Sequence, residues 1–450
     1  MEWILKLENA LWSGPLFVLL MGSHLYFTVT LKGVQRWTLR GIKLSLRPSR
    51  GENGVSSFGA LATSLAAAIG TGNIVGIATA VALGGPGAVL WCWLTGVFGM
   101  ATRYAESVLS LKHRRKEAGA VVGGPMYVLE DALHMPRLGK CFAFLGVAAA
   151  VGTGALLQSN AVATTLRQAA GVPLWISGAV LTVCGAMVIL GGVQSISSVC
   201  EKLVPAMSAL YMAGCVWLLL ANRTVLPETF RVIVSGAFSK EAAGGGFAGM
   251  LLGKAARYGV ARGLFTNEAG MGTAPMAAVI APAEKDGEEA LVSMTGVFWD
   301  TVVICAMTGL ALVSSMLRAP EVFQGQAGSG LCYLAFSLIP GGGWILTVCL
   351  VIFAFATVVG WCWYGECCSR YLWGEQSVKI YRVCYLAGAF LGVFWGAESA
   401  WSFGGILAGL MAVPNLVALL LLRKEIKDSI RELQDRPGKK PGRAERRNTK

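Results

Sequence analysis

The stretch AAAIGTGNIVGIA, residues 66–78, lies inside a long apolar run but has weak helix formers at its centre. Gly70, Thr71, Gly72 and Asn73 follow one another there, and glycine, threonine and asparagine all have low helix propensity. A helix break in lipid leaves backbone N–H and C=O groups unpaired, at a cost of several kcal/mol. It is tolerated only where protein or a polar cavity satisfies those groups. The stretch therefore predicts a broken membrane helix.

The rest of the chain has the composition of a helical membrane protein. Its 450 residues are 55% hydrophobic and 14% charged, with a mean hydropathy of +0.60, whereas a soluble domain has about 25% charged residues. Cutting at charged and turn residues gives eleven predicted spans. Their approximate limits are 11–31, 57–83, 86–112, 139–168, 173–193, 199–222, 246–281, 289–317, 343–372, 380–397 and 402–422. We therefore predict an all-α polytopic protein in the lipid bilayer of the plasma (inner) membrane.

The net charge of +13 indicates orientation in this membrane and not nucleic-acid binding. Alternate loops hold 28 of the 38 Lys and Arg residues, and the opposite loops hold six. Basic loops mark the cytoplasmic side of a membrane protein. The N-terminus is thus predicted outside and the C-terminus inside, as an odd number of spans requires.

A second interrupted stretch predicts an internal repeat. GVARGLFTNEAGMGTAP, residues 259–275, lies in the middle of the seventh span, five spans after the first break and in the opposite orientation. Five spans plus five in inverted orientation is the plan of many secondary transporters, which bind the solute between the broken ends. The predicted divisions are an extra helix and basic loop (1–56), a first repeat (57–222), a second repeat with an external loop (223–422) and a basic tail (423–450). The alternative is that the glycines only allow close helix packing.

The break also indicates the chemistry of the ligand. A helix that begins at residues 71–73 presents free N–H groups and a positive dipole end, which suit a carboxylate. Carbonyl groups released at the other broken ends can accept from an ammonium group or coordinate a small cation. Together these groups fit an amino acid, although other anions stay open.

Ordered blocks along most of the chain resemble one family. They include GVSSFGALATSLAAAIGTGNIVGIA, GGPGAVLWCW, GMATRYAES, GGPMYVLE, EKLVP, RGLFTNEAGMGTAP, VIFAFATVVGWCWYGE and GLMAVPNLVALLLL. These blocks are similar to the alanine or glycine:cation symporter family of the amino acid–polyamine–cation group. The resemblance implies a leucine-transporter-like fold, uptake of a small neutral amino acid with a sodium ion, and no further cofactor.

The resemblance also assigns site residues by position. It implies a carboxylate site at Gly70, Thr71, Gly72 and Asn73, a hydrogen bond from Gln158, and side-chain pocket walls from Phe265 and Trp361. The implied sodium ligands are the carbonyls of Ala66 and Ile69, the hydroxyl of Thr357 and, where the family pattern has a threonine, the carbonyl of Ala356. The chain also departs from the pattern at Gly59 and Phe403, where glutamine and aspartate are usual.

Charged residues inside spans are costly in lipid and need a role. Glu268 and Asp300, with Arg262, are expected to form a buried ionic support for the seventh span's broken ends; the alternative is that Glu268 and Asp300 are candidates for ion or proton coupling. Arg103 and Glu106 are expected to form an i,i+3 pair. The alternative substrates are other amino acids, such as glutamine or serine, carried with protons. A channel or a membrane enzyme is disfavoured, because no filter motif or cluster of catalytic residues appears, so no catalytic residue is predicted.

The predicted orientation can be tested with reporters. A reporter placed after Arg423 should be cytoplasmic, and one in the loop 223–240 should be external, because the basic loops stay inside. Measuring reporter activity on each side of the membrane tests both positions. A cytoplasmic 223–240 loop would remove the inverted repeat, since the seventh span would no longer oppose the second.

Overall fold

The computed structural model describes residues 7–435 except 9, 13, 49–50, 52–53, 118–119, 239–252, 283–284, 325, 327 and 329. The first half contains α2 (Pro15–Thr30), the 3-10 helix η1 (Val34–Trp37), α3 (Thr38–Ser45), α4 (Ser57–Ala68), the 3-10 turn η2 (Thr71–Asn73), α5 (Val75–Gly84), α6 (Ala88–Lys112), α7 (Pro125–Asp131), α8 (Pro136–Ala149), the π-helix η3 (Ala150–Leu157), α9 (Gln158–Ala170), α10 (Leu174–Ile189) and α11 (Gly192–Ala221).

The second half continues with the same helical architecture. It contains η4 (Arg223–Val225), α12 (Leu226–Ala237), α15 (Lys254–Asn267), α16 (Pro275–Ala278), α17 (Asp286–Val297), the π-helix η5 (Phe298–Cys305), α18 (Ala306–Arg318), α19 (Pro320–Phe323), α20 (Gly330–Ser337), α21 (Gly342–Trp373), α22 (Ser377–Gly392), α23 (Ala397–Leu421) and α24 (Arg423–Asp435). Among the described residues the only strands are β1 (Arg115–Glu117) and β2 (Ala120–Val122), which pair antiparallel with Arg115 opposite Val122.

Helices lie in all eleven ranges that the sequence predicts as spans. Six of the described helical segments are long and apolar enough to cross a membrane alone, and the bent pair Ser57–Ala68 and Thr71–Gly84 makes a seventh. The count of eleven therefore stays a prediction. Residues 246–252 of the seventh predicted span lie outside the described residues, as does the end of the tail, 436–450.

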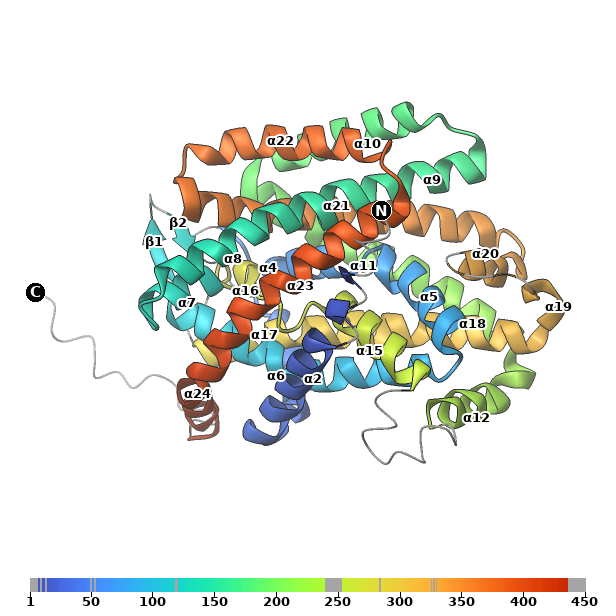
Figure 1. The fold of residues 1–450 in the computed structure, drawn as a ribbon, viewed down its shortest axis with the longest axis horizontal. Coiled ribbons are helices and arrows are strands. Elements are labelled where there is room, and N and C mark those ends of the chain that lie inside the picture. The colour runs from blue at the N-terminus through green and yellow to red at the C-terminus, as the bar shows by residue number, and fades with distance from the viewer. Residues whose placement is uncertain are drawn as a thin grey trace, which may run out of the picture.

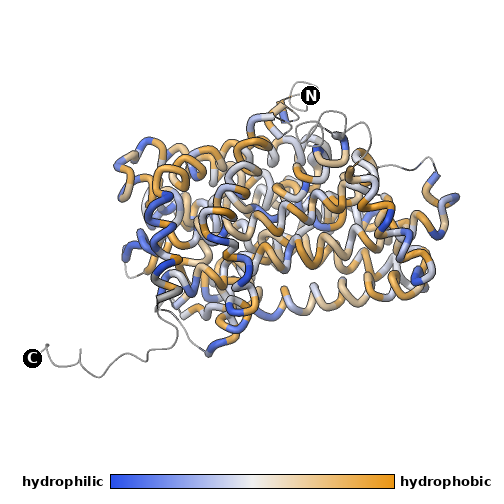
Figure 2. The backbone as a smooth tube through the Cα atoms, turned by 90° about the horizontal axis from the view of Figure 1, so that it is seen from below, coloured by the Kyte–Doolittle hydropathy of each residue, from blue (hydrophilic) through white to orange (hydrophobic). Residues whose placement is uncertain are grey.

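The segments between the spans separate to two ends of the molecule. The β1–β2 hairpin, α7 and α24 lie at one end, and α12, α19 and α20 lie at the other (Figure 1). Hydrophilic segments gather mostly at one end of the molecule, and largely hydrophobic helices run away from it (Figure 2). The expected external loop 223–240 is mostly helical, because it contains η4 and α12.

The helix α24, with which the tail begins, packs against this hydrophilic end. His113, at the end of α6, hydrogen-bonds Glu425 of α24 over 3.1 Å, and this bond lowers the pKa of the Glu425 carboxyl. Ile426 and Ile430 of α24 are buried. The tail thus begins as a packed helix.

The first break separates α4 from α5 with a bend of 61°. The side chain of Asn73 closes it, since its Oδ1 accepts from the Gly70 N–H over 2.9 Å and its Nδ2 donates to Asp300 Oδ1 over 2.6 Å. Asn73 is fully buried. One side chain therefore satisfies a backbone group of the break and joins it to the π-helix η5.

The second break, between α15 and α16, is held by two residues of α6. Arg103 donates from Nη2 to the Asn267 carbonyl over 2.5 Å. Glu106 Oε1 accepts from the Gly272 N–H over 2.8 Å and from Asn415 Nδ2 over 2.7 Å. Asn415 also donates to the Gly270 carbonyl. The expected Arg103–Glu106 pair is present at 3.8 Å, and it supports the backbone of another helix.

Replacing Glu106 with alanine tests this support. The change leaves the Gly272 N–H without its acceptor and the buried Arg103 without its carboxylate, so we expect a loss of about 3–5 kcal/mol in stability. Thermal unfolding of the purified protein in detergent measures it.

The matched control is Glu228→Ala on α12. Glu228 pairs with Arg231 over 3.5 Å, and both side chains are exposed, so its loss should cost less than about 1 kcal/mol. Equal shifts in the two variants would contradict the role of Glu106.

Candidate functional site

A small cavity lies where the two broken helices meet. Its volume is about 20 Å³, and residues from both breaks, α9, η3, α15, α21 and α23 line it. The lining residues are Ala67, Ala68, Gly70, Gly72, Thr153, Gln158, Phe265, Thr266, Glu268, Met271, Thr357, Trp361 and Ala408. Five of the seven residues that the resemblance assigns to the substrate are in this set. Residues from widely separated parts of the sequence therefore face one cavity.

The other two assigned residues, Thr71 and Asn73, do not line the cavity. Thr71 donates from its hydroxyl to Gln158 Oε1 over 3.1 Å and thereby orients the Gln158 amide. Asn73 closes the first break, as described above. The side chains of Thr71 and Asn73 therefore hold in place two residues that line the cavity, Gln158 and Gly70.

The glycines bring the backbone close to other elements at this point. A Cβ on Gly72 would lie 3.1 Å from Thr266 Cγ2 and 4.0 Å from Phe265 Cδ1. A Cβ on Gly70 would lie 2.6 Å from Thr357 Oγ1. Only glycine leaves the first break and these neighbours in their observed places.

Aromatic rings form the walls of the cavity. Phe265 makes edge contacts with Trp12 at 6.0 Å and a tilted contact with Trp401 at 5.6 Å. Trp361 is buried and meets Tyr364 at 5.6 Å. The contacts of Trp12 and Trp401 could not be predicted, because nothing in a single sequence links residues so far apart.

Three of the four candidate sodium ligands are close together. The Thr357 hydroxyl donates over 3.1 Å to the Ala66 carbonyl and lies 3.4 Å from the Ile69 carbonyl. Ala356 precedes Thr357 in α21 and is fully buried. The hydroxyl and the two carbonyls form a set of hard oxygen ligands, the type that small hard cations prefer in proteins.

The charged residues inside the predicted spans lie in different parts of the structure. Glu268 lines the cavity and accepts from the Thr273 hydroxyl over 2.7 Å. Asp300 accepts from Asn73 and from the Thr301 hydroxyl and does not line the cavity. The guanidinium of Arg262 lies 5.2 Å from the Trp401 ring. Arg103 and Glu106 hold the second break, as described above, and a supporting role of Glu268, Asp300 and Arg262 stays a prediction.

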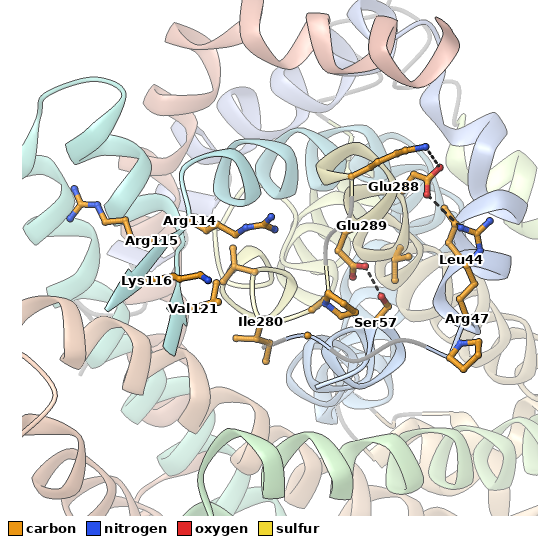
Figure 3. Close-up of a pocket in the computed structure, with 17 residues that line it drawn as sticks. Leu44, Arg47, Ser57, Arg114, Arg115, Lys116, Val121, Ile280, Glu288 and Glu289 are labelled. Atoms are coloured by element: carbon orange, nitrogen blue, oxygen red, sulfur yellow. Dashed lines mark hydrogen bonds and ion pairs between the residues drawn. The ribbon is translucent and has the colours of Figure 1, made fainter. Parts of the chain in front are cut away.

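Two larger pockets lie on either side of the cavity. One of about 310 Å³ is lined by Thr71 and Ile74 together with α20, α21 and Trp401. The other, of about 760 Å³, is lined by Ser57 at the start of α4, by the β1–β2 hairpin and by α17 (Figure 3). The first broken helix therefore reaches from one pocket to the other.

Two hydrogen bonds hold the start of α4 at the larger pocket. Ser57 donates to Glu289 of α17 over 2.7 Å (Figure 3), and Ser56 donates to Glu201 of α11 over 2.5 Å. A Cβ on Gly59 would lie 2.4 Å from Glu201 Oε1. The absence of a side chain at Gly59, where the family pattern has glutamine, gives Glu201 the space for this contact.

Comparison with known proteins identifies relatives along almost the whole chain. The model of the sodium:alanine symporter family matches residues 1–447. The chain is 43% identical over 425 residues to the sodium/alanine symporter AgcS of Methanococcus maripaludis, covering 92% of this chain and 93% of that protein. It is 34% identical over 452 residues to the probable sodium/glutamine symporter GlnT of Bacillus subtilis, covering 98% and 93%.

Solved structures agree on the fold. A Na⁺-coupled sialic acid symporter in an outward-open state matches with a TM-score of 0.59 at 14% identity, covering 91% of this chain and 86% of that one. A nucleobase-cation-symport-1 family transporter in a closed conformation matches with a TM-score of 0.52 at 12% identity, covering 86% and 96%. The fold is therefore that of leucine-transporter-like helical transporters, as the sequence predicts.

These matches confirm the family resemblance and exclude an enzyme as the class of this protein. They support sodium-coupled amino-acid symport across a membrane as its general activity. The chain belongs to the sodium:alanine symporter family.

Proposed function

We propose that this protein takes up alanine or glycine together with sodium by alternating access. The observation that carries the proposal is the position of Gly70, which lines the central cavity and lies next to the Thr357 hydroxyl at the same cavity. An amino acid in the cavity and a cation at Thr357 would therefore contact the same broken helix, which is the arrangement that couples two ligands.

The cavity walls support a small substrate. Backbone N–H groups near Gly72 suit the substrate carboxylate, Gln158 supplies a hydrogen bond, and Phe265 and Trp361 restrict the side chain. A volume of about 20 Å³ accommodates about one water molecule. Binding an amino acid therefore requires the broken helix ends to move apart. We expect this movement to open the cavity toward the two flanking pockets.

The coupling ion follows from the oxygen atoms around Thr357. We propose that sodium binds the carbonyls of Ala66 and Ile69, the Thr357 hydroxyl and the carbonyl of Ala356. A membrane potential of about 100 mV contributes roughly 2.3 kcal/mol per translocated charge, which is enough to concentrate the substrate. The alternative is proton coupling through Glu268 or Asp300, with serine or glutamine as the cargo. Proton coupling alone, and not the change of cargo, is favoured by a relative named as a putative sodium/proton-dependent alanine carrier, 32% identical to this chain.

The orientation and organisation belong to the same proposal. The N-terminus is external, the C-terminus is cytoplasmic, and the protein lies in the inner membrane. The β1–β2 hairpin and the pocket at Ser57 are then cytoplasmic, and the pocket at Ile74 is external. The extra first helix, the two five-helix repeats and the basic tail keep the boundaries predicted from the sequence.

The variant Gly72→Val tests the carboxylate site. Its side chain would meet Thr266 and Phe265 and block the approach of a ligand to the backbone, so labelled alanine should bind at least about tenfold more weakly. The purified protein in detergent gives the affinity, and gel filtration shows that it stays folded. Gly22→Val in α2 is the control, because a Cβ on Gly22 has no heavy atom within 4 Å. Normal alanine affinity in Gly72→Val would reject the site.

The variant Thr357→Ala tests the sodium site. Losing one oxygen ligand should raise the sodium concentration for half-maximal alanine uptake about tenfold, as measured in proteoliposomes. Thr229→Ala is the control, because Thr229 of α12 is also buried but donates to the Val225 carbonyl of η4 and does not line the cavity. Uptake that ignores sodium and follows an imposed pH gradient would favour the proton alternative.

A further inference from the structure

Glu268 is the one charged residue that lines the central cavity in the part of the chain that the structure describes. It directly follows α15, at the second helix break, and is only 4% exposed. A buried carboxylate is costly unless hydrogen bonds and a cation compensate for the water that it has lost. The partners of Glu268 therefore indicate what this position requires.

The hydrogen bonds of this carboxylate are incomplete. Oε2 accepts from the Thr273 hydroxyl over 2.7 Å, but no described residue donates a hydrogen bond to Oε1. Oε1 is also not among the described polar atoms that the protein encloses completely without a partner. An ionised carboxylate has about four acceptor positions. One oxygen of Glu268 is thus open to a donor that enters the cavity.

The charge of Glu268 also lacks a partner. Among the described residues, no Lys, Arg or His forms an ion pair with it. Arg103 acts on it electrostatically, but the Arg103 guanidinium binds the Asn267 carbonyl and pairs with Glu106 at 3.8 Å. The carboxylates of Glu106 and Asp300 also act on Glu268, so three acidic groups share one guanidinium here. This arrangement attracts a further cation to the cavity.

The amino group of the substrate is the cation that fits this place. The proposed sodium site has its own oxygen atoms around Thr357. An α-amino acid whose carboxylate binds at Gly72 carries its ammonium group on the adjacent carbon atom. Both breaks line the same small cavity, so that ammonium group can reach the second break while the carboxylate stays at the first. The other side chains that line the cavity are uncharged, and Glu268 alone can neutralise it.

We propose that the Glu268 carboxylate binds the ammonium group of the substrate and restricts this transporter to substrates with a cationic amino group. The inference rests on the proposed function and names the residue that recognises one end of the cargo. Each helix break then holds one charged end of the amino acid. Because hydrogen bonds to charged groups are stronger than neutral ones, removing the charge should weaken alanine binding at least about tenfold.

The test uses Glu268→Gln, which keeps the shape and the acceptor for Thr273 but removes the charge. Two ligands are compared on the purified protein in detergent with sodium: labelled alanine, and L-lactate as its competitor, which has a hydroxyl in place of the ammonium group. Sodium binding without alanine is measured separately.

The matched control is Glu366→Gln. Glu366 of α21 is a buried carboxylate that pairs with Arg370 and Arg382 over 3.2 and 2.8 Å, and it does not line the cavity. Gel filtration shows that each variant is folded.

In Glu268→Gln, alanine should bind at least about tenfold more weakly, while the affinity for lactate and the affinity for sodium alone change less than about twofold. Glu366→Gln should change none of the three by more than about twofold. Normal alanine affinity in Glu268→Gln, or equal losses for alanine and lactate, would overturn the proposal. A loss of sodium binding without alanine would assign Glu268 to the coupling ion and would also overturn it. A wild type that binds no small amino acid would reject the proposed function itself.

Discussion

Every backbone polar group at the two helix breaks needs a partner, because lipid and packed apolar side chains supply none. At the first break the partner is Asn73, and at the second break it is the set Arg103, Glu106 and Asn415. These contacts hold the backbone of both breaks in place beside the cavity. The position of the cavity, and of every residue that lines it, depends on these few polar contacts in the interior of the molecule.

Gly70 connects the two proposed ligand sites. Its missing side chain leaves room for the Thr357 hydroxyl, and Gly70 and Thr357 both line the cavity. A ligand that orders this backbone at one site changes the affinity at the other, and this coupling is reciprocal by thermodynamic necessity. In the proposed mechanism, one residue therefore transmits the effect of sodium to the amino acid without a longer chain of contacts.

Local features of the sequence predicted more than contacts between distant residues did. The glycine clusters marked both breaks, and the apolar runs marked the helices, because both signals lie within a short window. The resemblance assigned Gln158, Phe265 and Trp361 to the substrate site, and all three line the cavity. Their roles stay predictions. The support from Glu106 and Asn415 could not be predicted, since the two residues are 309 positions apart. The π-helix at residues 150–157 has no marker in its composition, and so Thr153 was missed.

The backbone at Glu268 has a consequence for what this position is for. Its φ of +54° is in the left-handed region, which costs a residue with a Cβ about 1–2 kcal/mol and costs glycine almost nothing. Gly270 and Gly272, in the same break, also have positive φ. The backbone conformation alone would favour a third glycine at position 268. The chain instead has a side chain there whose carboxylate lines the cavity and accepts from the Thr273 hydroxyl across the break, so the strain at position 268 is offset at least in part within the break itself.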